Sequence, residues 1–270
     1  MPSSVTTAAP SVRLKSIALP PEHGGWGFVI EPILLGLLVA PSWGGLAFGV
    51  AVLGVFLARH PLKIAVTDWR RGKRYARTVA AERVALGYLG AAGAGLIAAL
   101  LLAGPAILVP VVLAVPLGIV QLGGTLAGRG RDLVPELAGA VALAAAAASI
   151  ARAGGESLGL ALGLWAVLAA RDVPSILYVR ERLHLDKGKA YRPALVLVVH
   201  VLAVVALVAL AAADRGPWLA APAAAILALR AAWGLSAYRK PVPVKTIGFL
   251  EVFYGLLVVV SAGLGYLLDL

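Results

Sequence analysis

Two stretches of the sequence combine many basic residues with a few acidic ones, a composition suited to binding phosphate. The first, residues 59–77, reads RHPLKIAVTDWRRGKRYAR and contains one acid, Asp68. The second, residues 171–192, reads RDVPSILYVRERLHLDKGKAYR and includes Asp172. Guanidinium groups bind phosphate oxygens directly, whereas carboxylates hold phosphate only through a cation such as Mg²⁺. Because a segment needs no acids to orient it in a membrane, the interleaved acids favour a site in these two stretches.

The bases near the two aspartates are predicted to bind phosphate directly. They are Lys63, Arg70, Arg71, Lys73, Arg180, Arg182 and Lys189. Three further side chains, His23, Glu31 and Glu251, are predicted to line the site. Glu31 is included because an ionised carboxylate inside an apolar segment costs a few kcal/mol unless it is paired. Two alternatives stay open: the bases only orient the chain and contact anionic headgroups, and Glu251 only bonds a neighbouring helix.

The rest of the chain is apolar enough to lie in a membrane. Hydrophobic residues make up 61% of the sequence, against roughly 45–50% in soluble domains. The runs are continuous in Leu, Ala and Val and lack the alternation of barrel strands, so they predict helices. A net charge of +11 would suggest nucleic acid in a soluble chain; here we expect no nucleic-acid partner. The chain has no cysteine, which excludes a disulfide, a thiol nucleophile and a Cys metal site.

The fold class predicted from these runs is an all-α integral membrane bundle of nine helices. The predicted spans are residues 26–40, 45–57, 84–103, 107–126, 137–151, 158–170, 194–213, 218–229 and 247–268. Residues 1–22 are predicted to form a short polar tail, because no apolar core of signal-peptide length lies near the start. Residues 23–270 are predicted to form a single transmembrane domain.

The distribution of charge predicts the orientation of these spans. If the N-terminus is cytoplasmic and the spans alternate, all but two of the 24 Lys and Arg residues fall on the cytoplasmic side. The exceptions are Arg152 and Arg215. Basic residues are enriched in the cytoplasmic loops of membrane proteins. We therefore expect a multi-pass protein of the cytoplasmic membrane, with its N-terminus inside and its C-terminus outside.

Nine helices, with long cytoplasmic loops after the second and the sixth, resemble the plan of the UbiA prenyltransferase superfamily. The first family motif, Asn-Asp-x-x-Asp, is similar to residues 67–71, with Thr67 in place of Asn and Arg71 in place of the second Asp. The second motif is matched in similar order by Asp172, Tyr178, Arg180, Glu181, Arg182, Asp186, Lys187, Gly188 and Lys189. The resemblance implies catalytic and Mg²⁺-binding roles for Asp68 and Asp172, with Thr67 and Tyr178 lining the site.

Two other segments are similar to the YwiC-like family of bacterial membrane proteins. They are residues 21–26, PEHGGW, and residues 59–63, RHPLK, which place His60 at the candidate site. This family resemblance carries no activity to the chain. It indicates a distant UbiA relative in which acidic motifs have partly become basic.

Three functions follow as hypotheses. The leading one is a bundle that binds a prenyl diphosphate or another phosphorylated lipid at its cytoplasmic side and, if it is catalytic, transfers the prenyl group. The second is a transporter for a small anion. The third is a non-catalytic partner in assembly of a membrane complex. Membrane lipids are the expected partners in every case.

Overall fold

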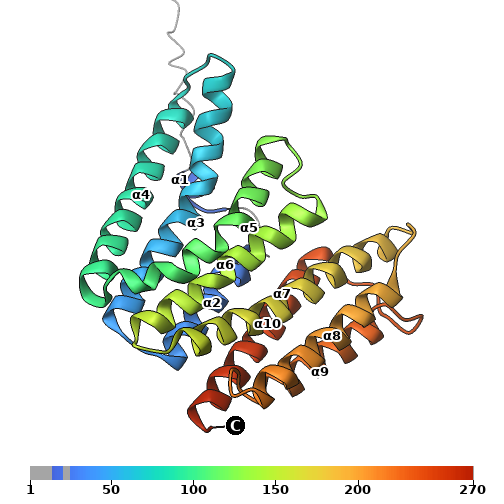
Figure 1. Cartoon of the computed structure of the whole chain (residues 1–270). Helices are drawn as coiled ribbons and strands as arrows, with labels where there is room; N and C mark the ends of the chain where they lie inside the picture. Colours follow the sequence, from blue (N-terminus) through green and yellow to red (C-terminus); the bar gives the residue numbers. More distant parts are fainter. Residues whose placement is uncertain (1–13, 21–24, 270) are drawn as a thin grey trace, which may run out of the picture.

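The computed structural model describes residues 14–20 and 25–269, and their regular structure is entirely helical (Figure 1). The helices, in chain order, are α1 (Leu14–Ala18), α2 (Gly25–Val39), α3 (Trp43–Arg70), α4 (Ala76–Ala103), the short 3₁₀ turn η1 (Pro105–Leu108), α5 (Val109–Leu126), α6 (Leu133–Ala153), α7 (Leu158–Asp186), α8 (Pro193–Ala212), α9 (Ala220–Gly234) and α10 (Val244–Leu267). The predicted all-α class is confirmed for the described residues.

Seven helical segments of the described chain are long and apolar enough to cross a membrane. They are α3, α4, η1 with α5, α6, α7, α8 and α10. A helix rises 1.5 Å per residue, so about 20 residues span the hydrocarbon core. Helices α2 and α9 are also apolar but have only 15 residues each. The protein is therefore a polytopic helical membrane protein, and its described residues contain seven candidate spans and two shorter apolar helices.

The two basic stretches are largely helical, which corrects the prediction that they are loops. Helix α3 continues past the predicted end of its apolar segment to Arg70, and α7 continues to Asp186. Only residues 71–75 and 187–192 connect these helices to the next ones. The apolar segments were predicted to stop at their first charges, but helical hydrogen bonding continues across charged residues whose side chains are paired or exposed.

Small residues allow the helices to pack closely around α6. The core joins α2, α6, α7, α8, α9 and α10, and α6 contributes a run of buried alanines to it. Gly36 of α2 faces Ile150 of α6 so closely that an added Cβ would lie 2.7 Å from the Ile150 Cβ. Helices α3 and α4 form a long hairpin, which packs on α6 through α3. Close backbone contact of this kind is the usual way in which membrane helices associate.

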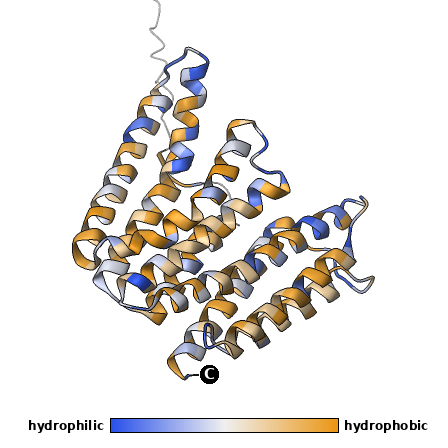
Figure 2. Cartoon of the chain, in the orientation of Figure 1, coloured by the Kyte–Doolittle hydropathy of each residue, from blue (hydrophilic) through white to orange (hydrophobic). Residues whose placement is uncertain are grey.

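The polar ends of four helix pairs gather along one edge of the bundle. The connections α3–α4, α5–α6, α7–α8 and α9–α10 lie along the upper and right-hand edge of Figure 1, and Figure 2 shows hydrophilic residues concentrated there. Ion pairs tie three of them together: Arg180 Nη1 lies 2.8 Å from Glu136 Oε2, and Arg239 Nε lies 3.2 Å from Asp186 Oδ1. The stretches predicted to share one side of the membrane thus share one edge of the fold.

Candidate functional site

The carboxylate of Asp68 is held inside the α3–α4 hairpin. Arg77 of α4 donates two hydrogen bonds to it, from Nε to Oδ2 at 3.0 Å and from Nη2 to Oδ1 at 2.7 Å. The hydroxyl of Thr78 donates a third, to Oδ2 at 2.7 Å. The Asp68 side chain is only 1% exposed. Both carboxylate oxygens are therefore used to close the hairpin.

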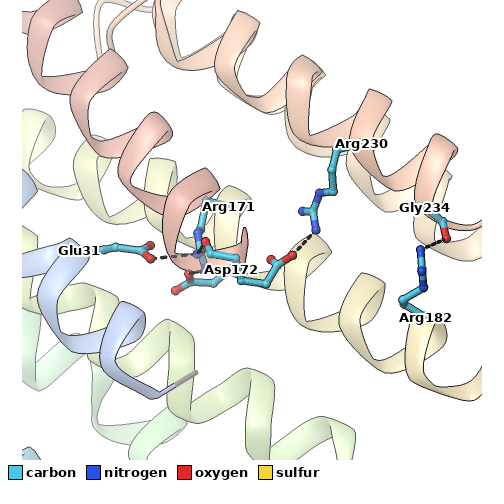
Figure 3. A network of polar contacts seen from close by, with 7 residues as sticks. Glu31, Arg171, Asp172, Arg182, Arg230 and Gly234 are labelled. Carbon is cyan, nitrogen blue, oxygen red and sulfur yellow. Dashed lines mark hydrogen bonds and ion pairs between the residues drawn. The ribbon is translucent and has the colours of Figure 1, made fainter. Parts of the chain in front are cut away.

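The second aspartate belongs to a different cluster, in the middle of α7. Asp172 Oδ1 accepts a hydrogen bond from Nη1 of its neighbour Arg171 at 3.1 Å. Nη2 of Arg171 donates to Glu31 Oε1 on α2 at 2.9 Å and to the backbone carbonyl of Glu251 on α10 at 2.8 Å. Figure 3 shows the Arg171 guanidinium beside the carboxylates of Glu31 and Asp172. One buried arginine thus joins α2, α7 and α10.

Two glycines leave the space that this ion cluster occupies. A Cβ on Gly255 of α10 would overlap Glu31 Oε1 and the Arg171 guanidinium. A Cβ on Gly27 of α2 would lie 2.7 Å from Glu31 Oε1. Any larger residue at Gly255 would push apart charges that lie in a low-dielectric interior, where unpaired charges are costly. The backbone is therefore shaped to admit the Glu31–Arg171 pair.

A second buried arginine, Arg230 of α9, lies beside this cluster. Its Nη1 pairs with Glu251 Oε1, and its guanidinium lies 4.0 Å from the ring centroid of Tyr178 and 5.0 Å from that of Tyr254. Its Nε and Nη2 are buried and have no hydrogen-bond partner in the described part of the protein. Buried donors normally find a partner, and an orphaned charged one is expensive. Arg230 thus keeps one edge available for an acceptor.

Arg230 lines a cavity of about 760 Å³ between α7, α9 and α10. The polar side chains in its wall are Tyr178, Arg182, Arg230, Lys240, Glu251 and Tyr254; the others are mainly apolar and include Ile226, Leu229, Trp233, Ile247 and Leu250. Leu229 and Trp233 are exposed at the bundle surface. Ligand cavities commonly measure about 300–1,000 Å³ and are apolar with a few convergent polar groups. This cavity has those properties.

The remaining predicted residues divide between the two regions. Arg182 is buried and bridges helices, donating from Nη1 to the Gly234 carbonyl at 2.6 Å (Figure 3) and from Nη2 to the Lys240 carbonyl at 2.7 Å. Arg180 pairs with Glu136 of α6. Five of the predicted phosphate-binding bases are exposed and form no ion pair with any described residue: Lys63, Arg70, Arg71, Lys73 and Lys189.

Two further predicted residues make contacts away from the cavity. His60 Nε2 lies 3.1 Å from the Ser16 carbonyl of α1, and Thr67 donates to the Lys63 carbonyl at 2.6 Å. His23 lies outside the described residues. Neither His60 nor Thr67 lines the cavity.

The predicted convergence of Asp68 and Asp172 is not seen in the structure. Asp68 lies near the tip of the α3–α4 hairpin, and α5 and α6 lie between that tip and α7 in Figure 1. Each aspartate is paired with its own arginine. The described residues also contain no group of three or more His, Asp or Glu side chains suited to a metal ion. The donor set at these two aspartates therefore does not fit a shared Mg²⁺ site.

Arg171 and Arg230 are the central residues that the sequence reasoning did not place in the site. The predicted spans end at the residue before each of them, so the sequence pattern places both in cytoplasmic connections. The available signal was a lone arginine followed by further helix-forming residues: α9 continues to Gly234, and α7 continues for 15 residues after Arg171. Ionisable residues within membrane helices are functional candidates.

The fold and the buried cluster define a polytopic helical membrane protein with ionisable side chains in its core. The model of the YwiC-like protein family matches residues 19–151, and the chain belongs to that family. The match contains Glu31 and Asp68, whereas Arg171, Asp172, Arg230 and Glu251 follow it. No curated protein and no solved structure matches the chain.

Proposed function

We propose that this YwiC-like protein binds an anionic amphiphile, such as a phosphorylated isoprenoid lipid, in the cavity between α7, α9 and α10. The observation that carries the proposal is the Arg230 side chain: the residue lines the cavity, and its buried Nε and Nη2 have no hydrogen-bond partner in the described part of the protein. A phosphate or diphosphate supplies acceptors in the geometry that guanidinium prefers. The anion would accept the hydrogen bonds that these two N–H groups do not make within the described part of the protein.

The lining of the cavity suits the two ends of such a ligand. Lys240 is exposed, forms no ion pair with the described residues and lies in the wall with Arg230, so it adds a second cation for the headgroup. The side chains of Ile226, Leu229 and Leu250 provide an apolar surface for the tail. Because Leu229 is 71% exposed on the bundle surface, a hydrocarbon chain has a path from the surrounding lipid.

This proposal moves the binding site away from the predicted basic stretch of α3. Tyr178, Arg182 and Glu251 are retained from the predicted set, and Arg230 replaces the arginines at the α3–α4 tip as the main anion ligand. Prenyl transfer and the UbiA-like plan remain expectations from the resemblance. Binding at Arg230 needs no Mg²⁺, so metal dependence becomes an outcome of the experiment.

The test is equilibrium binding of radiolabelled farnesyl diphosphate to the purified protein in an uncharged detergent. We expect saturable binding of the diphosphate and none of farnesol, which lacks the anion. Arg230→Gln should weaken binding at least about tenfold, or about 1.4 kcal/mol. Lys240→Ala, at an exposed position, should weaken it less without disturbing the core.

Arg70→Ala is the matched control, since it removes an exposed arginine at the other region. Equal losses in Arg70→Ala and Arg230→Gln, or a loss only in Arg70→Ala, would return the site to the α3–α4 tip. Release of inorganic diphosphate on addition of Mg²⁺ would show cleavage of the prenyl–oxygen bond, and recovery of the farnesyl group on an acceptor other than water would identify a transferase. No binding of either probe to the wild type would end the proposal.

A second candidate function is transport of a small anion. It is favoured by Arg171 and Asp172, which lie near the middle of the 29-residue helix α7 and contact Glu31 on a neighbouring helix. Buried charges at this depth often mark a pathway for ions or substrates. Uptake of radiolabelled phosphate into proteoliposomes, abolished by Arg230→Gln and with no binding of farnesyl diphosphate, would favour transport over lipid binding.

We further propose that all nine apolar helices cross the cytoplasmic membrane, with the N-terminus inside and the C-terminus outside. The basic connections support this orientation because they share one edge of the bundle. The chain lacks cysteine, so single cysteines can be placed at exposed positions on either side of α8, as Ala190→Cys and Ala213→Cys. An impermeant maleimide should label Ala213→Cys in intact cells and Ala190→Cys only after permeabilisation. The reverse pattern would invert the topology.

A further inference from the structure

The buried cluster contains more carboxylates than guanidinium groups. Its acids are Glu31, Asp172 and Glu251, and its bases are Arg171 and Arg230. All five side chains are at most 13% exposed. If every group is ionised, the cluster carries one uncompensated negative charge in a low-dielectric interior. Such a charge is costly, and a carboxylate in this position is readily neutralised by a proton.

The two arginines of the cluster, Arg171 and Arg230, differ in the partners of their guanidinium groups. Arg171 uses Nη1 for Asp172 and Nη2 for Glu31 and the Glu251 carbonyl, so its donors serve the α2–α7–α10 junction. The side-chain carboxylate of Glu251 instead pairs with Arg230. Arg230 is therefore the counter-ion of Glu251 and, under the proposed function, also the ligand of the bound anion.

One guanidinium carries a single positive charge and cannot neutralise two anions. The guanidinium of Arg230 pairs with Glu251 through Nη1, and its Nε and Nη2 have no partner in the described part of the protein. An anion bound to Nε and Nη2 would therefore contact the same guanidinium as Glu251. A second negative charge at this distance disfavours the ionised form of a carboxylate. We propose that binding of an anionic headgroup at Arg230 is coupled to uptake of one proton by Glu251. The proton passes from solvent to a carboxylate oxygen of Glu251, and no covalent bond to the ligand changes.

The other groups around Glu251 identify it as the acceptor of this proton. The charged and titratable side chains that share the ion cluster or the cavity wall with Glu251 are Glu31, Arg171, Asp172, Tyr178, Arg182, Arg230, Lys240 and Tyr254. Glu31 and Asp172 both keep Arg171 whether or not an anion is bound. Only Glu251 shares its arginine with the ligand, and it lines the cavity, where a proton can reach it.

This inference rests on the proposed function and is tested by calorimetry of the same ligand. Titration of farnesyl diphosphate into the purified protein, in two buffers of different ionisation enthalpy at one pH, gives the number of protons taken up per ligand. The wild type should take up about one proton more than Glu251→Gln. Comparing the two proteins removes any proton exchanged by the diphosphate itself.

The coupling also predicts how the affinity changes in Glu251→Gln. Glu251→Gln should bind the diphosphate about tenfold more tightly at pH 8, because the competing negative charge is gone. In the wild type, affinity should fall with rising pH more steeply than in Glu251→Gln. Glu31→Gln, the control, should keep the additional proton.

The outcomes separate the two proposals. Binding with the same proton count in wild type and Glu251→Gln overturns the coupling and leaves the binding site standing. Loss of the extra proton in Glu31→Gln but not in Glu251→Gln would show that Glu31, and not Glu251, takes up the proton, and would overturn the coupling. Absence of binding in the wild type rejects the proposed function itself. If Glu251→Gln does not fold, Glu251→Asp, which keeps the acid, is used together with the pH dependence of binding to the wild type. A wild-type affinity that does not change with pH, above the pH range in which the diphosphate itself titrates, contradicts the coupling.

Discussion

The α3–α4 tip and the α7–α9–α10 cluster look alike in sequence but differ in how their charges are used. At the tip, Asp68 is bound by Arg77 and Thr78, nine and ten residues further along the chain. In the cluster, Arg171 reaches Glu31, which lies 140 residues away. The first set closes one hairpin. The second fixes helices from both halves of the protein against one another.

The depth of the charges explains this difference. Arg77 is 54% exposed, so its charge is partly solvated, whereas Arg171 is 4% exposed within a core of apolar helices. Exposed ion pairs contribute little, while removal of one member of a buried pair leaves a charge that nothing solvates. The ion pairs of two stretches with similar composition therefore differ in how much the protein is destabilised when one partner is removed.

The largest expected effect on stability is that of Arg171→Ala. The substitution leaves Glu31 and Asp172 buried without their counter-ion and should destabilise the protein by about 3–5 kcal/mol. Thermal unfolding of the purified protein in detergent, followed by tryptophan fluorescence or by aggregation, measures this as a marked fall in melting temperature.

A compensated variant sharpens this prediction. Arg171→Met combined with Glu31→Gln and Asp172→Asn removes the charges together and should recover much of the lost stability. Lys189→Ala, which removes an exposed base from the same original stretch, is the matched control and should leave the melting temperature unchanged. An Arg171→Ala protein as stable as Lys189→Ala would show that the cluster is not a structural centre.

Much of the fold could be predicted from the sequence because it depends on apolar length. Each of the nine predicted segments overlaps an α-helix, and the end at Ala103 and the start at Leu158 are matched to the residue. The predictions failed at the basic ends. There the apolar pattern stops before the helix does, as at residue 57, where α3 continues to Arg70.

The site was less predictable, because it depends on which helices meet. Glu31 and Glu251 were both predicted to line the site, Glu31 from the cost of burying an unpaired carboxylate, but the sequence does not show that both contact Arg171. Arg171 and Arg230 follow apolar segments directly and are read as interfacial bases by any rule that ends a span at its first charge. The pairing of Asp68 with Arg77 was equally hidden, since it depends on the register of two helices in the hairpin.

A smaller effect is expected from Arg77→Ala at the hairpin tip. The substitution removes two of the three hydrogen bonds to Asp68 and retains that of Thr78, so the end of the hairpin should loosen while the core persists. We expect a lower melting temperature than in the wild type but a higher one than in Arg171→Ala, and faster hydrogen exchange confined to the facing ends of α3 and α4. Because Arg77 does not contribute to the cavity, farnesyl diphosphate affinity should stay within about twofold of the wild type, a change of only about 0.4 kcal/mol. Loss of binding in Arg77→Ala with the melting temperature retained would connect the two regions and refute the separation between them.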